Sequence, residues 1–179
     1  DVAMLTLSEI AHAVDGVLSG EDVRFSSVSI DSRTLQPDAL FVAIDGERFC
    51  GTDFARDAKQ AGAVAVMASS APDRETPSIV VKDTELALWK LAELWRSRVS
   101  LPMIGVTGSN GKTTVKEMIA SILGKMGRTH ASPGNFNNHL GVPLTLLGIR
   151  PEHEFAVVEM GMSHPGEIGQ LTRLVRPSI

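Results

Sequence analysis

Apolar residues along the chain follow two periods, which predict a fold that mixes strands with helices. Three short runs are β-branched and apolar and are bounded by Pro, Gly or Asp, as buried strands are. These runs cover residues 39–44, 63–67 and 78–81. Between the first two, residues 53–61 predict a helix with Phe54 and Ala58 facing inward. We therefore expect a small α/β unit that ends near Asp83.

Two further segments predict helices on either side of these runs. Thr6 and Glu9 have the capping-box spacing, and apolar residues then recur at helical intervals. Residues 85–97 are amphipathic, with an apolar stripe that includes Trp95 and charged positions facing water. We expect both Trp89 and Trp95 to be core residues. The second helix predicts a passage from a first domain, residues 1–83, into a second domain, residues 84–179.

The second half of the chain predicts a parallel sheet. Residues 103–106 and 155–159 are apolar strands, and a glycine-rich turn and a helix at 113–126 follow the first of them. Apolar positions recur along this helix, so we expect Met118 and Met126 in the core, before Gly127 ends the helix. The order strand, turn, helix, strand predicts right-handed crossovers. The expected fold class is α/β: a small α/β unit followed by a second domain built on a parallel sheet.

Composition narrows the possible partners. The 179 residues carry a net charge of −4 without a block of Lys or Arg, which argues against an electrostatic nucleic-acid or membrane surface. No apolar run approaches the roughly 20 residues that span a bilayer, and the first residues lack the pattern of a signal peptide. The single Cys50 has no partner for an internal disulfide, which fits a reducing cytoplasm.

The glycine-rich turn reads VTGSNGKTT from Val106 to Thr114. Successive backbone N–H groups in such a loop can point at one anion, and the following helix adds the positive end of its dipole. We expect Lys112 to reach the terminal phosphates of ATP and the Thr113 hydroxyl to bind Mg²⁺. The pattern G-x-x-x-x-G-K-[ST] is only partly met, because Val106 occupies the first glycine position. The predicted ATP-binding residues are Thr107, Gly108, Ser109, Asn110, Gly111, Lys112, Thr113 and Thr114.

Alternatives remain open at several of these positions. The turn could be a plain strand-to-helix connection, and Thr114 could be a helix-face residue. Glu159 ends an apolar strand at the edge of the sheet where open α/β folds bind ligands, so it is a candidate Mg²⁺ ligand. Its alternative is a solvated strand terminus.

Three ordered blocks resemble the ATP-dependent muramyl ligases. They read TGSNGKTTVKEMI, SPGNFNNHLGVPLTLL and VVEMGMSHPGEI. The resemblance extends over essentially the whole chain, because SIDSRTLQPDALFVAIDGERF is similar to the amino-terminal substrate domain of that family. The second and third blocks resemble the branch that uses D-alanyl-D-alanine, although a sibling that adds one amino acid shares the other blocks.

The resemblance implies a small amino-terminal substrate domain followed by part of a P-loop-type ATP-binding domain. It also implies a reaction and its participants. ATP would phosphorylate the terminal carboxylate of UDP-N-acetylmuramoyl-tripeptide, and the amine of D-alanyl-D-alanine would attack the acyl phosphate, in cytoplasmic peptidoglycan synthesis for cell growth and division. Lys112 and Glu159 would be catalytic, Thr113 and Glu159 would hold Mg²⁺, and the protein would be a monomer. The implied substrate-binding residues are Ser32, Arg33, Asn135 and Asn138.

Each substrate residue has a simpler interpretation. Arg33 could be a surface residue beside an Asp-Ser turn, and the asparagines could form an Asx turn with a helix cap. His164 is a possible metal ligand but more typical of a loop, and Glu167 is expected to cap the next helix. Members of the family continue through further domains, so we expect this segment alone not to complete the ligation.

The chain departs from the family pattern in two places. His139 stands where the family commonly has an acid, and Cys50 and Thr52 replace frequent Asp and His residues. The uridine contacts of the family therefore cannot be transferred to this chain. Two other classes of function share the same loop and acid: a P-loop kinase or NTPase, and a nucleotide-binding module without catalysis.

Overall fold

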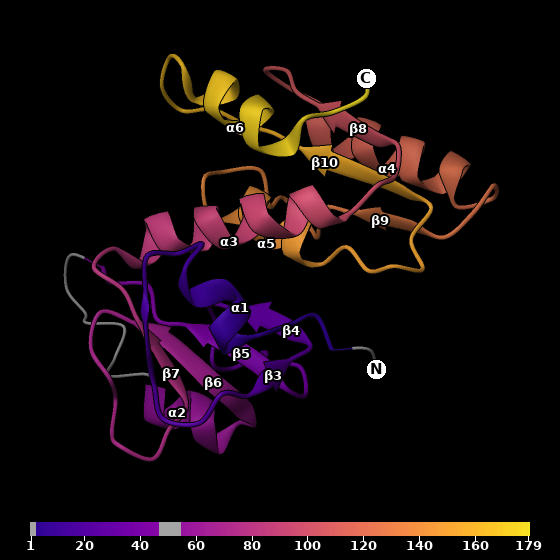
Figure 1. The fold of residues 1–179 in the computed structure, drawn as a ribbon. Helices are drawn as coiled ribbons and strands as arrows, with labels where there is room; N and C mark the ends of the chain where they lie inside the picture. Colours follow the sequence, from indigo (N-terminus) through magenta and orange to yellow (C-terminus); the bar gives the residue numbers. More distant parts are fainter. Residues whose placement is uncertain (1–2, 47–54) are drawn as a thin grey trace. The chain divides into compact units, whose positions relative to one another are not determined.

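The computed structural model describes residues 3–46 and 55–179, which form two compact units (Figure 1). The units comprise residues 1–94 and 95–179, and they divide within helix α3 (Thr84–Arg98). The predicted domain boundary, after residue 83, coincides with the start of this helix. No helix in the described residues is long and apolar enough to cross a membrane.

The amino-terminal unit is built on a five-stranded sheet in the order β2-β7-β6-β5-β4. Strands β4 to β7 are parallel to their neighbours and β2 is antiparallel to β7, while β1 and β3 form a separate antiparallel pair. The three predicted apolar runs are confirmed as β5, β6 and β7. The elements are β1 (Leu5–Thr6), α1 (Leu7–Ala11), β2 (Val17–Ser19), β3 (Arg24–Phe25), β4 (Ser27–Ser29), β5 (Ala39–Val42), α2 (Ala55–Gln60), β6 (Ala63–Ala68) and β7 (Ser78–Val80).

The helices of this unit follow from local sequence. The capping box predicted at the start of α1 is confirmed: Thr6 Oγ1 accepts from Glu9 N, and Glu9 Oε2 accepts from Thr6 N. Helix α2 confirms the predicted helix at 53–61 within the described residues, while Phe54 lies outside them. Ala58 is buried in a cluster with Phe41 and Val66, so α2 packs on the sheet as its inward face predicts.

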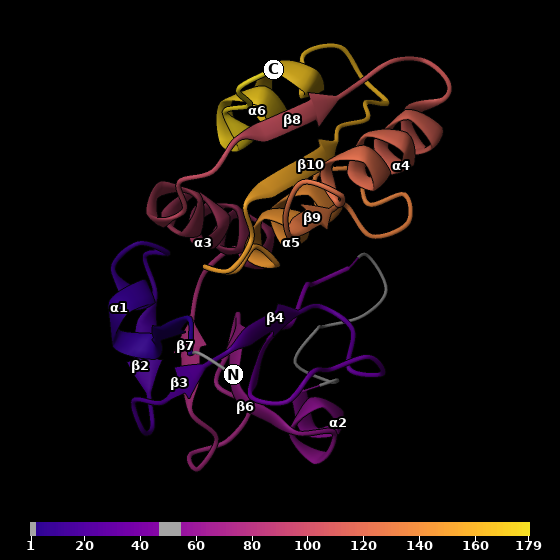
Figure 2. The same ribbon diagram turned by 90° about the vertical axis from the view of Figure 1, so that its right-hand side faces the viewer.

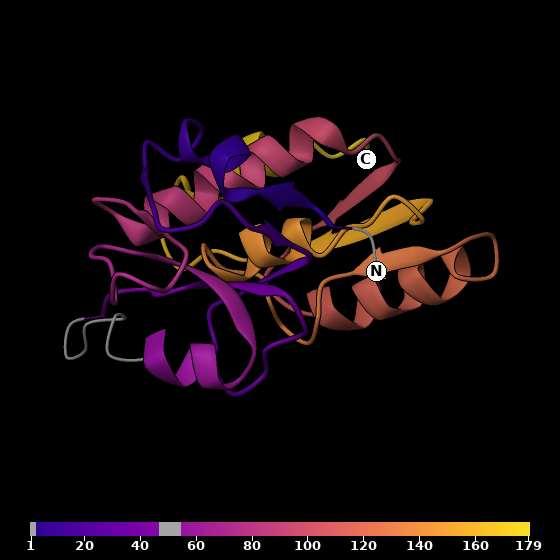
Figure 3. The same ribbon diagram turned by 60° about the horizontal axis from the view of Figure 1, so that its bottom comes forward.

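The carboxyl-terminal unit is built on three parallel strands in the order β8-β10-β9. Figures 2 and 3 show α4 on one face of this sheet and α5 and α6 on the other. The predicted strands at 103–106 and 155–159 are confirmed, whereas β9 was not predicted. The elements are β8 (Met103–Val106), α4 (Lys112–Leu123), β9 (Thr129–Ala131), α5 (Gly141–Leu147), β10 (Phe155–Glu159) and α6 (Glu167–Val175).

The register of this sheet places the site. Val106, the last residue of β8, lies opposite Glu159, the last residue of β10. Because the strands are parallel, the loop that follows β8 and the carboxylate that ends β10 emerge at the same edge. Trp95 supports this unit as a core residue: it is 7% exposed and its Nε1 donates to Ile149 O over 3.0 Å. Trp89, by contrast, is only half-buried.

The orientation of α4 corrects one prediction. Met118 and Met126 were expected in the core, but they are 61% and 69% exposed. The helix also ends at Leu123, with Gly124 as its C-cap, so Met126 lies after α4 and the predicted end at Gly127 is wrong. The helix instead buries Lys116 completely. Residues 116 and 118 lie on different sides of a helix, because each position turns the chain by about 100°. The side of α4 that is buried is thus the side that carries Lys116, and Met118 lies on the exposed side.

Because Met118 is exposed on α4, replacing it by alanine should destabilise the protein less than the same change at a buried methionine. Met118→Ala should change the free energy of unfolding by less than about 0.5 kcal/mol, because an exposed side chain leaves no cavity. Met103→Ala should cost about 2 to 5 kcal/mol, because Met103 is fully buried in β8. Urea unfolding followed by circular dichroism measures both. Equal losses for the two variants would contradict the orientation of α4.

Candidate functional site

The loop between β8 and α4 has the backbone of an anion cradle. Residues 107–111 are exposed, and Gly108 and Gly111 have φ angles of 149° and 77°, which side-chain-bearing residues rarely adopt. Gly111 is the N-cap of α4 and provides no side-chain hydrogen bond. The first turn of this 12-residue helix contains no acidic residue. Its N–H groups and the positive end of its dipole are thus available to an anionic ligand.

Two polar side chains of the first turn lie beside this loop. Lys112 Nζ donates to Gly108 O over 2.8 Å, which folds the ammonium back over the loop. Thr113 Oγ1 lies 3.0 Å from Glu159 Oε1 and 3.1 Å from Oε2. Thr114 is exposed on the helix. The fold therefore brings the predicted loop residues and the predicted strand-end acid into one site.

Glu159 is a buried carboxylate, which excludes the interpretation as a solvated strand terminus. Its exposure is 1%, and its backbone N–H donates to Ser132 Oγ over 2.8 Å. Oε1 also accepts from Asn137 Nδ2 over 2.9 Å. A buried carboxylate needs such donors, because burial without them costs several kcal/mol. These contacts fix the position of both carboxylate oxygens.

Lys116, which was not predicted as a site residue, lies beside Glu159 in the same site. Its Nζ donates to Ser132 O over 2.8 Å and to Gly134 O over 2.5 Å, and it lies 3.8 Å from Glu159 Oε2. The spacing of residues along α4 could have indicated that Lys116 belongs to the site. Position 116 falls four residues after Lys112 and three after Thr113, so these side chains share one side of the helix.

In the asparagine-rich loop before α5, one side chain contacts Glu159 and another forms a turn. Asn138 Oδ1 accepts from Leu140 N over 3.2 Å and from Gly141 N over 2.8 Å, as in the alternative of an Asx turn. The N-cap of α5 is Leu140, without a side-chain cap hydrogen bond. Asn135 is exposed. Asn137, which was not singled out, makes the contact with Glu159. A Cβ at Gly161 would lie 2.9 Å from the Asn137 side chain, so this approach requires glycine.

The donors of the site fit Mg²⁺ bound together with a nucleotide. Thr113 and Glu159 supply a hydroxyl and a carboxylate, and Mg²⁺ typically takes one or two protein oxygens with phosphate oxygens and water in the other positions. No group of three His, Cys, Asp or Glu residues within 3–46 and 55–179 could hold a metal by itself. His164 is exposed and joins no such group, and Glu167 Oε2 accepts from Ser163 N over 3.0 Å at the start of α6.

The predicted substrate residues Ser32 and Arg33 belong to the amino-terminal unit, in the turn after β4. The Arg33 side chain is 85% exposed and donates to both carboxylate oxygens of Asp31 over 2.9 Å. Hydrogen bonds from the side chain and backbone of Arg33 lower the pKa of Asp31 to about 2. The arrangement is an Asp-Ser turn with an ordered surface guanidinium, which leaves its outer edge open to a ligand.

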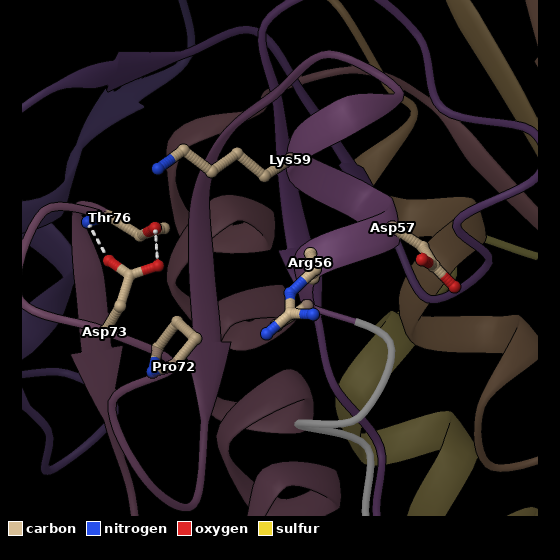
Figure 4. A pocket seen from close by; sticks show the side chains of 7 residues that line it. Arg56, Asp57, Lys59, Pro72, Asp73 and Thr76 are labelled. Atoms are coloured by element: carbon tan, nitrogen blue, oxygen red, sulfur yellow. Dashed lines mark hydrogen bonds between the residues drawn. The ribbon is translucent and has the colours of Figure 1, made fainter.

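A cavity of about 450 Å³ lies elsewhere in the same unit, between α2 and the segment after β6 (Figure 4). In Figure 4 Asp73 bonds to Thr76, and Lys59 extends toward this pair. Neither Ser32 nor Arg33 lines the cavity, so it is separate from the predicted substrate residues. Cys50 and Thr52 lie outside the described residues.

Curated relatives match nearly the whole chain. It is 46% identical over 173 residues to UDP-N-acetylmuramoyl-tripeptide–D-alanyl-D-alanine ligase of Escherichia coli, covering 97% of this chain and 38% of the relative. The ligase of the same name from Bacillus subtilis is 43% identical over 182 residues, with coverages of 96% and 39%. The chain thus spans less than half the length of these relatives.

Solved structures agree with this match. The corresponding D-alanyl-D-alanyl ligase from Acinetobacter baumannii is 35% identical with a TM-score of 0.86, covering 98% of this chain and 41% of that one. MurF ligase from Thermotoga maritima in complex with ADP is 34% identical with a TM-score of 0.71, with coverages of 84% and 35%.

Two family models match consecutive parts of the chain. The model for the Mur ligase family, catalytic domain, matches residues 24–95, and the model for the Mur ligase middle domain matches residues 106–179. The expected resemblance to muramyl ligases is therefore confirmed by models, relatives and structures together. The chain belongs to the Mur ligase family.

Proposed function

We propose that this chain is the substrate-binding and phosphate-binding part of an ATP-dependent ligase that joins D-alanyl-D-alanine to UDP-N-acetylmuramoyl-tripeptide. The observation that carries the proposal is the contact of Thr113 with the buried Glu159 at the mouth of the glycine loop. The names of the relatives support the substrates, and the ADP complex of a similar ligase supports the nucleotide. The reaction belongs to peptidoglycan synthesis and would take place in the cytoplasm.

The proposed chemistry starts from a poor electrophile. The peptide carboxylate takes the γ-phosphoryl group of ATP and becomes an acyl phosphate, with ADP as the leaving group. The amine of D-alanyl-D-alanine then attacks the carbonyl carbon, phosphate leaves, and the nitrogen loses a proton to give the amide. The first transfer joins two anions, so its main requirement is neutralisation of charge.

The residues of the site meet this requirement. The amides of residues 107–112 and the Lys112 ammonium would bind the phosphate tail and orient it. Thr113 and Glu159 would hold Mg²⁺, which neutralises phosphate oxygens when bound. Because Glu159 is already fixed by Thr113 and Asn137, the carboxylate needs little reordering to receive the ion.

The amino-terminal unit would bind the UDP portion of the substrate. Arg33 presents a planar guanidinium whose donors match diphosphate oxygens. Asp31 holds two of these donors, which restricts the side chain before the ligand arrives. Ser32 adds a hydroxyl in the same turn, and Asn135 and Asn138 remain candidate substrate contacts in the other unit.

The first prediction from the proposed function tests the reaction itself. In the full-length protein, phosphate release from ATP should require both UDP-N-acetylmuramoyl-tripeptide and D-alanyl-D-alanine. Lys112→Ala should lower kcat by at least about 100-fold, because it removes a cation from the transferred phosphoryl group. A coupled phosphate assay measures both effects, and Lys125→Ala, at an exposed position after α4, should retain activity.

Three outcomes would favour other functions. Release without the peptide acceptors would indicate an NTPase, and phosphorylation of one substrate without amide formation would indicate a kinase. Release that requires a single amino acid in place of the dipeptide would indicate a sibling ligase.

The second prediction concerns the metal. Glu159→Gln keeps the shape of the side chain but removes its charge, so the Mg²⁺ concentration for half-maximal phosphate release should rise at least about 10-fold. Titration with MgCl₂ at saturating ATP measures this value. Glu93→Gln, at an exposed position on α3, is the matched control. An unchanged Mg²⁺ requirement in the Glu159 variant would remove this residue from the metal site.

The third prediction concerns the UDP substrate. Arg33→Ala should raise KM for UDP-N-acetylmuramoyl-tripeptide by about 10-fold or more, because a charged hydrogen bond to phosphate contributes about 1.5–3 kcal/mol. The value of kcat should change little, since the residue would bind ground state and transition state alike. Arg24→Ala, at an exposed position on β3, is the control. A fall in kcat with KM unchanged would argue against the proposed role.

A further inference from the structure

We propose that Lys116 is a positioning residue, whose buried ammonium holds Glu159 and the loop after β9 in the geometry that receives Mg²⁺. The inference rests on the proposed function and adds a residue that the phosphate-loop pattern does not contain. Lys116 contacts the loop after β9 and lies beside Glu159, through which it would act. It is therefore distinct from Lys112, whose ammonium lies at the loop itself.

One nitrogen atom joins three segments of the chain. Lys116 projects from α4, the carbonyls of Ser132 and Gly134 belong to the loop after β9, and Glu159 ends β10. The same loop supplies Ser132 Oγ, which accepts from Glu159 N, and Asn137 Nδ2, which donates to Glu159 Oε1. Anchoring the loop through its carbonyls therefore also fixes the groups that hold the carboxylate.

The Lys116 ammonium does not form a hydrogen bond with Glu159. Lys116 Nζ lies 3.8 Å from Glu159 Oε2, which is too long for a hydrogen bond. The ammonium thus lies beside the carboxylate without occupying its lone pairs. Its short contacts are instead with two main-chain carbonyls and, at 3.1 Å, with the exposed carboxylate of Glu117.

Stability alone does not account for this residue. Burying an ammonium is costly even when it is paired, and apolar replacement of a buried ion pair is often neutral or stabilising. Apolar side chains are at hand on the same helix, yet Met118 and Ile122 face solvent while Lys116 takes the buried side. The burial of a charged residue beside Glu159, in place of an apolar one, supports a role for Lys116 at the site.

The test uses the full-length protein and a fluorescent ATP analogue, with affinity measured in excess MgCl₂ and in EDTA. In Lys116→Met, affinity in EDTA should stay within 2-fold of the parent protein, whereas the gain on adding Mg²⁺ should shrink about 10-fold. Lys125→Met is the matched control and should behave as the parent. A folded Lys116→Met protein with an undiminished or larger Mg²⁺ gain would overturn the inference.

A second variant and a structure complete the test. Lys116→Gln retains an amide donor for the carbonyls but lacks the charge, and it should show an intermediate gain. A metal-free crystal structure of the better-folded variant should show the Glu159 carboxylate displaced from Thr113 Oγ1. An undisplaced carboxylate, or loss of cooperative unfolding in both variants, would assign Lys116 to stability and overturn the positioning role.

The failure of this inference can be told from the failure of the proposed function. If the parent protein shows no Mg²⁺-dependent binding of the analogue, the proposed nucleotide site itself fails. If the parent shows that binding but no phosphate release with both substrates, only the assigned reaction fails, and the Lys116 measurement still stands.

Discussion

A carboxylate removed from water must be surrounded by donors, and the carboxyl-terminal unit is arranged around that constraint at Glu159. Thr113 supplies a hydroxyl from α4, and Asn137 supplies an amide from the loop before α5. Lys116, also on α4, supplies a positive charge 3.8 Å from the carboxylate. Two of these residues lie on α4 and the third lies in a distant loop. The contacts therefore form only when α4, β10 and the loops at the sheet edge are in place together.

Parallel pairing makes this meeting possible. The register that sets Val106 against Glu159 directs the glycine loop and the acid to one edge, where α4 also begins. The helix then serves two purposes along its length. Its first turn leaves amides uncapped for an anion, while its second turn buries Lys116 against the loop after β9. Met118 lies on the other side of the helix from Lys116 and is exposed.

The two units present different chemical groups to the ligands proposed for them. The turn at Arg33 presents a charged fork on the surface of the amino-terminal unit, held by Asp31, whereas the phosphate loop is made of backbone. A guanidinium suits a diphosphate approached from outside, and a ring of amides suits a phosphate tail enclosed by a loop. This division agrees with a family whose models match the two parts of the chain separately.

The sequence by itself determined the longer apolar strands, several helices and the glycine-rich loop, because these depend on short-range periodicity and on glycines that permit a tight turn. It thereby placed β5, β6, β7, β8 and β10, the capping box of α1, and Glu159 at a strand end. Tertiary structure decided which side of α4 is buried, which asparagine of the loop reaches Glu159, and where β9 pairs. Those outcomes depend on groups far apart in the chain: the buried side of α4 is the one whose Lys116 ammonium reaches the loop after β9 and the end of β10, and local pattern does not contain these contacts.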